Sequence, residues 1–360
     1  MPKRELHHAG SDLPEPRLTE LMAYHYDLTV RGVRPAPHGW HLVTDRGLVT
    51  MCPVKNRKKA YWEWLDGLLA HLRQQGLTQL PHLVRTQRGK LSFSGFRGNY
   101  ALWLNKEGQP CQWRDAATWS RVAQTLAAIH RASRDMSLAS APRRVLTRRN
   151  WRARWEEDLA FLTTVRTACT VVTNRTAVDR LWLNSYTYVA TLLETARNYL
   201  DRLGSERDVR ASLKRGTVTQ RHLSRKMWVR RASGAYSYLD WDDTVVDSPV
   251  TDLAQHIHLA AGKRSVFIER LHHLLGGYET VNPLKENDWG LLYARLLYPE
   301  QLVRAVSRIY LQRGISEEDA ATHLARALEE QRRREYHLRL IPSLFKDTFH
   351  RSIPEVDWLK

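Results

Sequence analysis

The sequence predicts an α+β protein in two lobes, with a small antiparallel sheet first and a mainly helical part after it. Three observations carry this prediction. Residues 39–105 contain β-rich stretches separated by turn signals. From residue 151 onward, apolar residues recur at helical spacing almost without interruption. The chain has 360 residues, and single hydrophobic cores stop growing near about 250–300, so two lobes are expected.

The first lobe is predicted to contain a hairpin, a helix and a second β-rich segment. Gly39 to Cys52 is rich in β-prone residues on both sides of the turn "DRG" at Asp45–Gly47, a pattern typical of a hairpin. The helix "AYWEWLDGLLAHLRQQG" then ends at Gly76, a residue common just past helix C-termini. Lys90 to Asn105 returns to a β pattern.

The second lobe is expected to begin after a turn-rich break, "EGQP", at Glu107–Pro110. Helices follow, interrupted by a hairpin at 217–243 whose turn is "ASG", Ala232–Gly234. The chain shows no repeat of fixed period. The expected divisions are a polar leader at 1–19, a β-rich lobe at 20–106, a helical lobe at 107–340 and a tail at 341–360.

The composition is that of a folded, strongly basic protein. Lys and Arg number 56 against 38 Asp and Glu, a formal net charge of +18, so nonspecific attraction to nucleic acid and other polyanions is expected. The runs "RVLTRRNWRAR" and "EEQRRREYHLRL" are either solvated helix faces or, with Trp151, Trp155 and Tyr336 between the charges, nucleic-acid contacts.

Cysteine usage and hydropathy indicate a cytosolic origin. The three cysteines, Cys52, Cys111 and Cys169, are scattered and odd in number, which excludes a disulfide framework or a CxxC zinc site. The paired histidines, His7–His8 and His272–His273, lack ligands at metal-binding spacing. No signal peptide and no membrane span is expected, because no window approaches about 18 uninterrupted apolar residues.

Three stretches together carry a resemblance: "LAAIHRAS" (Leu126–Ser133), "YLDWDDTVVDSPVTDLA" (Tyr238–Ala254) and "GGYETVNPLKENDWGLLYARLLYPEQL" (Gly276–Leu302). In a two-lobed chain with a central hairpin, they resemble the aminoglycoside phosphotransferase-like superfamily of protein-kinase-like folds. Within it, residues 20–336 resemble the spore coat CotS family. The resemblance implies a two-lobed protein-kinase-like fold.

Phosphate-transferring members of that superfamily carry a loop H-G-D-L-x-x-x-N and then a strand ending in I-D-F or similar. The Asp serves the acceptor hydroxyl, while the Asn and the later Asp hold Mg²⁺. On this chain the loop falls at 220–227, so the resemblance puts His222 at the Asp position and Met227 at the Asn position. Only Asp240 keeps a metal-binding role by position. A thioether does not suit Mg²⁺, so the catalytic loop is interpreted as degenerate.

The resemblance implies a second loss in the first lobe. The phosphate-binding Lys of the family aligns with Cys52, and a neutral thiol cannot clamp phosphates as an ammonium does. Glu63 is the acid expected to pair with that Lys, and without it Glu63 is interpreted as a surface residue. Lys55, Lys58 and Lys59 are nearby replacements.

Several of these residues have plain structural readings. Asp240 either ligates a metal or forms an Asx turn. His222 is interpreted as a structural histidine, since Arg221, Arg225 and Lys226 around it disfavour its protonation. Those three cations are a predicted anion-binding group. Asp252 lies in the first turn of a helix that has Pro249 at its start, where an acid complements the helix dipole.

The sequence and the resemblance together predict a kinase-fold protein with a degenerate phosphotransferase site. It is expected to be a structural or binding protein of the spore coat, made in the mother-cell cytoplasm, with other coat proteins as partners. Two alternatives stay open. One is a divergent active small-molecule or protein phosphotransferase that uses ATP, with or without Mg²⁺, through Lys55 or Lys58 and Asp240 or Asp242. The other is a basic polyanion-binding protein with affinity for a phosphate-bearing anion or nucleic acid.

Overall fold

The computed structural model describes residues 15–36, 38–54, 58–134, 142, 151–203, 217–220, 223–311 and 315–359. The chain forms two compact units. The first unit comprises Met1–Leu146, Thr217–Val246 and Thr280–Asn282, and the second comprises Thr147–Gly216, Asp247–Glu279 and Pro283–Lys360. The first helix after the sheet and the central hairpin therefore belong to the same unit as the sheet, whereas 107–340 was expected to form a lobe of its own.

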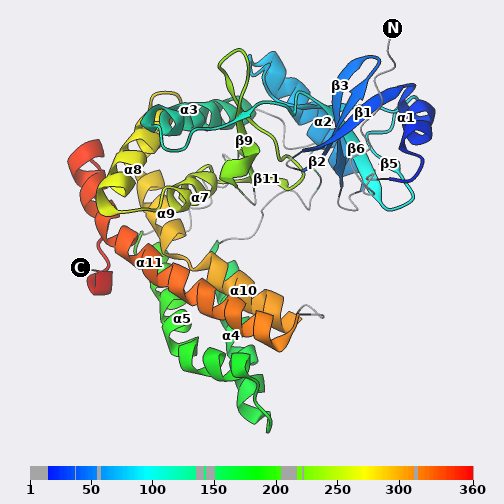
Figure 1. Cartoon of the computed structure of the whole chain (residues 1–360). Coiled ribbons are helices and arrows are strands. Elements are labelled where there is room, and N and C mark those ends of the chain that lie inside the picture. The colour runs from blue at the N-terminus through cyan, green and yellow to red at the C-terminus, as the bar shows by residue number, and fades with distance from the viewer. Residues whose placement is uncertain are drawn as a thin grey trace. The chain divides into compact units, whose positions relative to one another are not determined.

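The first unit contains an antiparallel sheet in the order β1-β2-β3-β6-β4, with β5 paired to β6 (Figure 1). Its strands are β1 (Val30–Ala36), β2 (Gly39–Thr44), β3 (Gly47–Pro53), β4 (His82–Val84), β5 (Phe93–Ser94) and β6 (Asn99–Leu104). The predicted hairpin is confirmed, since β2 and β3 pair with Thr44 opposite Gly47. Gly47 has a φ of 110°, a conformation that favours glycine.

The two faces of this sheet carry different side chains, because successive residues of a strand point to opposite faces. Met51 and Leu102 lie on one face and pack in a core with Leu42, Phe93 and residues of α1 (Leu18–Tyr26). The other face carries Thr50, Cys52, Ala101 and Trp103, and all four are buried. This second face is where the phosphate-binding lysine was expected.

Two helices of the first unit have clear boundary signals. The predicted helix is α2 (Lys59–Gln74), and Gly76 follows it with a φ of 92°. Helix α3 (Ala116–Ser133) begins after Asp115, whose side chain accepts a hydrogen bond from the Ala117 amide at 3.1 Å. Such a cap satisfies one of the backbone donors left open at a helix start.

The expected break at "EGQP" contains a short strand. Gln109–Pro110 is β7, which pairs with β9 (Trp228–Arg230), and β9 pairs in turn with β10 (Tyr236–Tyr238). Gly108 permits this approach, because a Cβ built there would lie 2.7 Å from Cγ2 of Val229. The turn between β9 and β10 is closed by a hydrogen bond from the Gly234 amide to the Arg231 carbonyl, at the predicted "ASG".

The rest of the central segment pairs differently from the predicted hairpin. Thr217–Gln220 forms β8, which pairs with β11 (Thr244–Asp247) and not with β10. The 3-10 turn η2 (Arg225–Met227) leads directly into β9. The stretch 217–243 thus contains both strands of the β9–β10 pair but only one strand of the β8–β11 pair.

The second unit is helical, as expected. Its elements are α4 (Trp151–Val171), α5 (Ala177–Arg202), α7 (Val250–Leu259), α8 (Arg264–Glu279), α9 (Glu286–Leu297), α10 (Glu300–Leu311), α11 (Glu317–Phe349) and η3 (Asp357–Leu359). Trp151 and Trp155 are buried, and Trp155 stacks on Tyr298 with ring centroids 4.9 Å apart. These two aromatics are therefore core residues and are not available for base stacking beside the basic run.

Helix α11 passes the expected start of the C-terminal tail. It continues through Pro342 to Phe349, and Ile341, Leu344 and Phe345 are buried along it. Packing of this apolar face outweighs the cost of a proline inside a helix. None of the described helices is long and apolar enough to cross a bilayer.

Candidate functional site

The catalytic-loop position predicted for asparagine is occupied by a buried apolar side chain. Met227 ends η2 and is 5 % exposed. Its amide donates to the Ser224 carbonyl at 3.1 Å and its carbonyl accepts from the Leu239 amide at 2.9 Å. The backbone here is held in place while the thioether packs inward. His222 and Arg221 lie outside the described residues.

The other two cations of the loop, Arg225 and Lys226, have different surroundings. The guanidinium of Arg225 lies over the indole rings of Trp119 and Trp113, 5.0 and 5.7 Å from their centroids. Trp113 also donates its ring N–H to the Arg225 carbonyl at 3.3 Å. Lys226 is exposed. Cation–π contact orients Arg225 toward the base of α3, so its charge is engaged by aromatic faces.

Asp240 follows β10 and uses both carboxylate oxygens. Oδ1 accepts a hydrogen bond from the Asp242 amide at 3.4 Å, which is the Asx-turn geometry. Oδ2 lies 3.4 Å from Nε2 of His38, in the connection between β1 and β2. His38, between β1 and β2, therefore lies beside Asp240, the one acid that keeps its expected position. Sequence reasoning missed His38, which stands in a stretch with no motif of its own.

The residue after Asp240 anchors this acidic turn in the core. Trp241 is fully buried and donates its ring N–H to the Tyr238 carbonyl at 2.9 Å. Tyr61 of α2 donates to the Asp242 carbonyl at 2.8 Å. Helix α2 is thereby tied to the turn that carries Asp240.

A lysine lies beside the thiol where the family lysine was expected, but it comes from another part of the chain. Lys106, just after β6, places its Nζ 3.5 Å from Sγ of Cys52 and 4.3 Å from the ring centroid of Trp103. Cys52 is 1 % exposed and Lys106 is 5 % exposed. Burial raises the pKa of the Cys52 thiol, and Lys106 offsets only part of that effect. The thiol is therefore neutral near pH 7.

Among the described residues, Lys106 has no carboxylate partner. Its ammonium is held by a weak sulfur acceptor and an aromatic face. The lysines that the sequence offered as replacements for the phosphate-binding lysine do not contact Cys52 in the described residues. Lys58 and Lys59 are exposed at the start of α2, and Lys55 lies outside the described residues. Sequence reasoning missed Lys106 because it stands immediately before the predicted turn-rich break, where a lysine is normally solvated.

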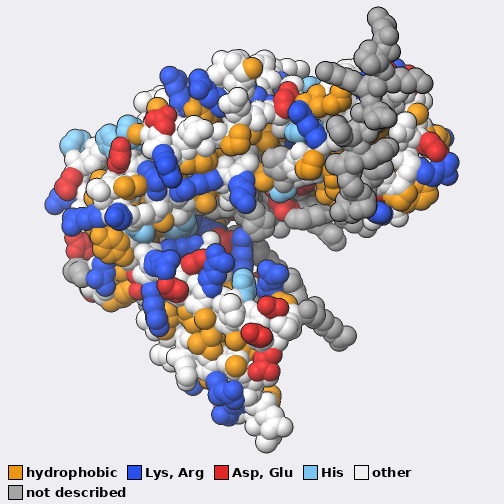
Figure 2. Space-filling view, in the orientation of Figure 1, with side chains coloured by type: hydrophobic (Ala, Val, Ile, Leu, Met, Phe, Trp, Pro, Cys, Tyr) orange, Lys and Arg blue, Asp and Glu red, His pale blue; other side chains and the backbone are white. Residues whose placement is uncertain are grey.

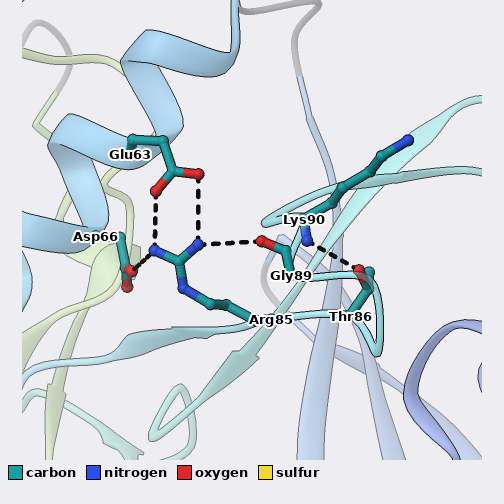
Figure 3. A network of polar contacts seen from close by, with 6 residues as sticks. All are labelled: Glu63, Asp66, Arg85, Thr86, Gly89 and Lys90. Carbon is teal, nitrogen blue, oxygen red and sulfur yellow. Dashed lines mark hydrogen bonds and ion pairs between the residues drawn. The ribbon is translucent and has the colours of Figure 1, made fainter.

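Glu63 of α2 has a cationic partner, Arg85, which lies just after β4 (Figure 3). Both of its carboxylate oxygens accept from Arg85, at 2.8 and 3.3 Å, and Arg85 also donates to Asp66 at 2.6 Å and to the Gly89 carbonyl at 3.0 Å. The hydrogen bond from Arg85 lowers the pKa of Glu63. Since both side chains are exposed, this clamp fixes α2 against the β4–β5 connection without reaching Cys52.

These residues do not fit a magnesium-bound nucleotide. Mg²⁺ takes oxygen ligands in near-octahedral geometry, and the predicted asparagine position offers a buried thioether instead. Within the described ranges, no group of three or more His, Cys, Asp or Glu side chains is arranged to hold a metal ion.

A protein-family model described as "Spore coat putative kinase YutH" matches residues 19–341. The chain belongs to this spore coat kinase family. The match confirms the resemblance to spore coat kinase-like proteins, and the family's name associates the protein with the spore coat. Comparison with curated protein sequences gave no match.

Solved structures share the fold across nearly the whole chain. An aminoglycoside phosphotransferase from Alicyclobacillus acidocaldarius has a TM-score of 0.69 at 15% identity, with 96% of this chain and 100% of that chain covered. Spectinomycin phosphotransferase APH(9)-Ia, in complex with ADP and spectinomycin, has a TM-score of 0.62 at 13% identity, with 89% and 98% covered. The aminoglycoside phosphotransferase-like fold is thus confirmed for this spore coat kinase family member.

Replacing Lys106 with methionine is expected to leave the free energy of unfolding unchanged or to raise it by up to about 1 kcal/mol. An ion buried without a carboxylate partner costs desolvation energy, and an apolar side chain of similar volume avoids that cost. Urea unfolding followed by tryptophan fluorescence measures the effect. Lys106→Ala serves as the control, because the cavity it leaves is expected to cost about 1–3 kcal/mol. A comparable loss in the methionine variant would show that the ammonium itself stabilises the fold.

Proposed function

We propose that this protein is a kinase-fold component of the spore coat that does not transfer phosphate. One observation carries the proposal: Cys52 and Met227, at the positions expected for the phosphate-binding lysine and the metal-binding asparagine, are buried and neutral. Phosphoryl transfer relies on charged groups that hold the phosphates and the metal, and neither residue supplies one.

The arrangement around these two residues supports a fixed binding scaffold. The sheet face that carries Cys52 also carries Trp103, and Lys106 lies against both; all three side chains are buried. Helix α2 is fastened by Tyr61 to the Asp240 turn and by Glu63 to Arg85, and no phosphate is needed to position it. The proposed setting is synthesis in the mother-cell cytoplasm followed by residence in the coat, with other coat proteins as partners.

A panel of nucleotides tested with and without Mg²⁺, by thermal shift and by transfer from radiolabelled ATP, tests this function. No magnesium-dependent stabilisation and no transfer are expected, and Asp240→Asn is expected to behave as the parent protein. A ligand present at 100 times its Kd would stabilise the fold by about 2.7 kcal/mol, so binding is readily seen. Transfer that Asp240→Asn abolishes would overturn the proposal.

One observation favours an ATP-dependent phosphotransferase as a second candidate function. Lys106 brings an ammonium to within 3.5 Å of Cys52, while Asp240 stays in place. In that case a magnesium-dependent ATP shift appears and is lost in both Lys106→Met and Asp240→Asn. Loss in Lys58→Met or Lys59→Met instead would assign the role to the start of α2.

A further inference from the structure

A cavity of about 690 Å³ lies within the first unit. Its lining comes from β1, from the segment after β6 and from the β9–β10 turn: Arg34, Glu107, Gly108, Gln109, Arg230, Arg231 and Ala232. Three of these residues are arginines and one is an acid. Lys and Arg side chains are otherwise spread over the face shown in Figure 2, whereas here three arginines share one cavity.

Arg231 holds the walls of this cavity together. It donates to the carbonyls of Glu107 and Asn105, to the Gln79 carbonyl at 2.8 Å and to the Ser237 hydroxyl at 3.2 Å. Three of these acceptors are backbone carbonyls and one is a hydroxyl, so none of these bonds neutralises the guanidinium. The β9–β10 turn is thereby fastened to the segment after β6, and the cavity exists before any ligand binds.

Arg230 is fixed by its strand. It is the last residue of β9 and pairs with Tyr236 of β10 on one side and Gln109 of β7 on the other. Its backbone position is therefore set by two neighbouring strands. A fixed backbone limits the conformational entropy that this segment loses when a ligand binds.

The cavity carries excess positive charge. Arg34 and Arg230 are exposed, and neither forms an ion pair with any residue that the structure describes. Glu107 is the lone acid among the lining residues, and burial works against the charged form of Arg231, lowering its pKa. An anion would neutralise part of this positive charge. Arginine binds phosphate and carboxylate through two parallel N–H donors, which suits planar or tetrahedral anions.

We propose that this cavity binds a small polyanion that carries two or more phosphate or carboxylate groups, without a metal. The volume falls in the range of small-molecule sites. Arg34 and Arg230 make the direct contacts, and Arg231 fastens the turn that follows Arg230 to the segment after β6. None of Cys52, Met227 and Asp240 lines the cavity, so the proposal stands whether or not phosphate transfer takes place.

Isothermal titration of the full chain with pyrophosphate and with citrate tests the site and separates phosphate from carboxylate ligands. The variant Arg34→Glu/Arg230→Glu is expected to bind at least about tenfold more weakly, because charge-assisted hydrogen bonds contribute about 1.5–3 kcal/mol each. The matched control Arg31→Glu/Arg264→Glu changes the net charge equally at exposed positions outside the cavity, and is expected to bind as the parent does. EDTA is expected to change nothing.

Each other outcome overturns the proposal. If the control variant binds equally weakly, the anions respond only to the net charge of the protein. If neither pyrophosphate nor citrate binds the parent protein, the cavity does not bind the proposed class of ligand. Loss of binding in EDTA would make the site metal-dependent. Tighter binding of a hexaglutamate peptide than of either small anion would assign the surface to a protein partner.

Should the double glutamate variant unfold, Arg34→Gln/Arg230→Gln removes the same donors without reversing the charge.

Discussion

Replacing Arg231 with alanine is expected to lower the free energy of unfolding of the first unit by about 2–4 kcal/mol. The guanidinium donates to the carbonyls of Gln79, Asn105 and Glu107 and to the Ser237 hydroxyl. Partly buried carbonyls that lose this donor keep their desolvation cost without the compensating bond. The loss is therefore larger than that of a single surface contact.

Two experiments measure this effect: chemical denaturation of the full chain gives the change in stability, and hydrogen exchange of the native protein gives the local opening of the segment 105–110. Arg230→Ala is the matched control, since it removes the neighbouring arginine, which is exposed, and is expected to cost less than about 0.5 kcal/mol. Faster exchange confined to this segment and the β9–β10 turn is expected in Arg231→Ala. Equal stability of the two variants would contradict the role assigned to Arg231.

The features that the sequence predicts correctly are those decided by neighbouring residues. The "DRG" turn and the helix end at Gly76 depend on residues that adopt conformations open mainly to glycine. The "ASG" turn between β9 and β10 follows the same rule, with Gly234 at a φ of 84°. The position of Asp240 after β10 follows from that hairpin.

The features that the sequence does not reveal depend on partners far apart along the chain. Gln109–Pro110 is a strand only because β9 lies beside it, and two residues carry no detectable β pattern. Glu63 pairs with Arg85, which is 22 positions later in the chain. Helical and strand periodicity relate only residues a few positions apart, so they do not predict such a pair. The extent of α11 past Pro342 likewise depends on packing.

The candidate site illustrates the same limit. Substitution of Cys52 and Met227 is visible in the sequence, because a motif fixes where to look. Lys106 is visible only in the structure, because its side chain reaches Cys52 from 54 positions away. A motif comparison records a lysine as lost even where the fold brings another one to the same thiol.

Replacing Glu300 with glutamine is expected to lower the free energy of unfolding at pH 7 by about 3–5 kcal/mol. Glu300 begins α10 and forms ion pairs with Arg295, which is buried, and with Arg304. Burial on its own would raise the pKa of Glu300, but Arg295, Arg304 and Arg154 outweigh it and lower the pKa to about 2. The variant leaves Arg295 as a buried charge with one partner fewer, which is the costly way to break such a pair.

The same pair predicts a pH dependence with a definite sign. A carboxylate whose folded pKa lies below its ordinary value of 4.5 stabilises the fold above that pH, and the contribution disappears as the pH falls from 4.5 toward 2. The difference between the parent and Glu300→Gln should therefore be largest at pH 7 and shrink steadily below pH 4.5 in urea unfolding experiments. Glu329→Gln breaks an exposed pair with Arg333 and is expected to cost less than about 1 kcal/mol at either pH. A difference between parent and Glu300→Gln that stayed constant down to pH 2 would mean that packing, and not the ion pair, explains the loss.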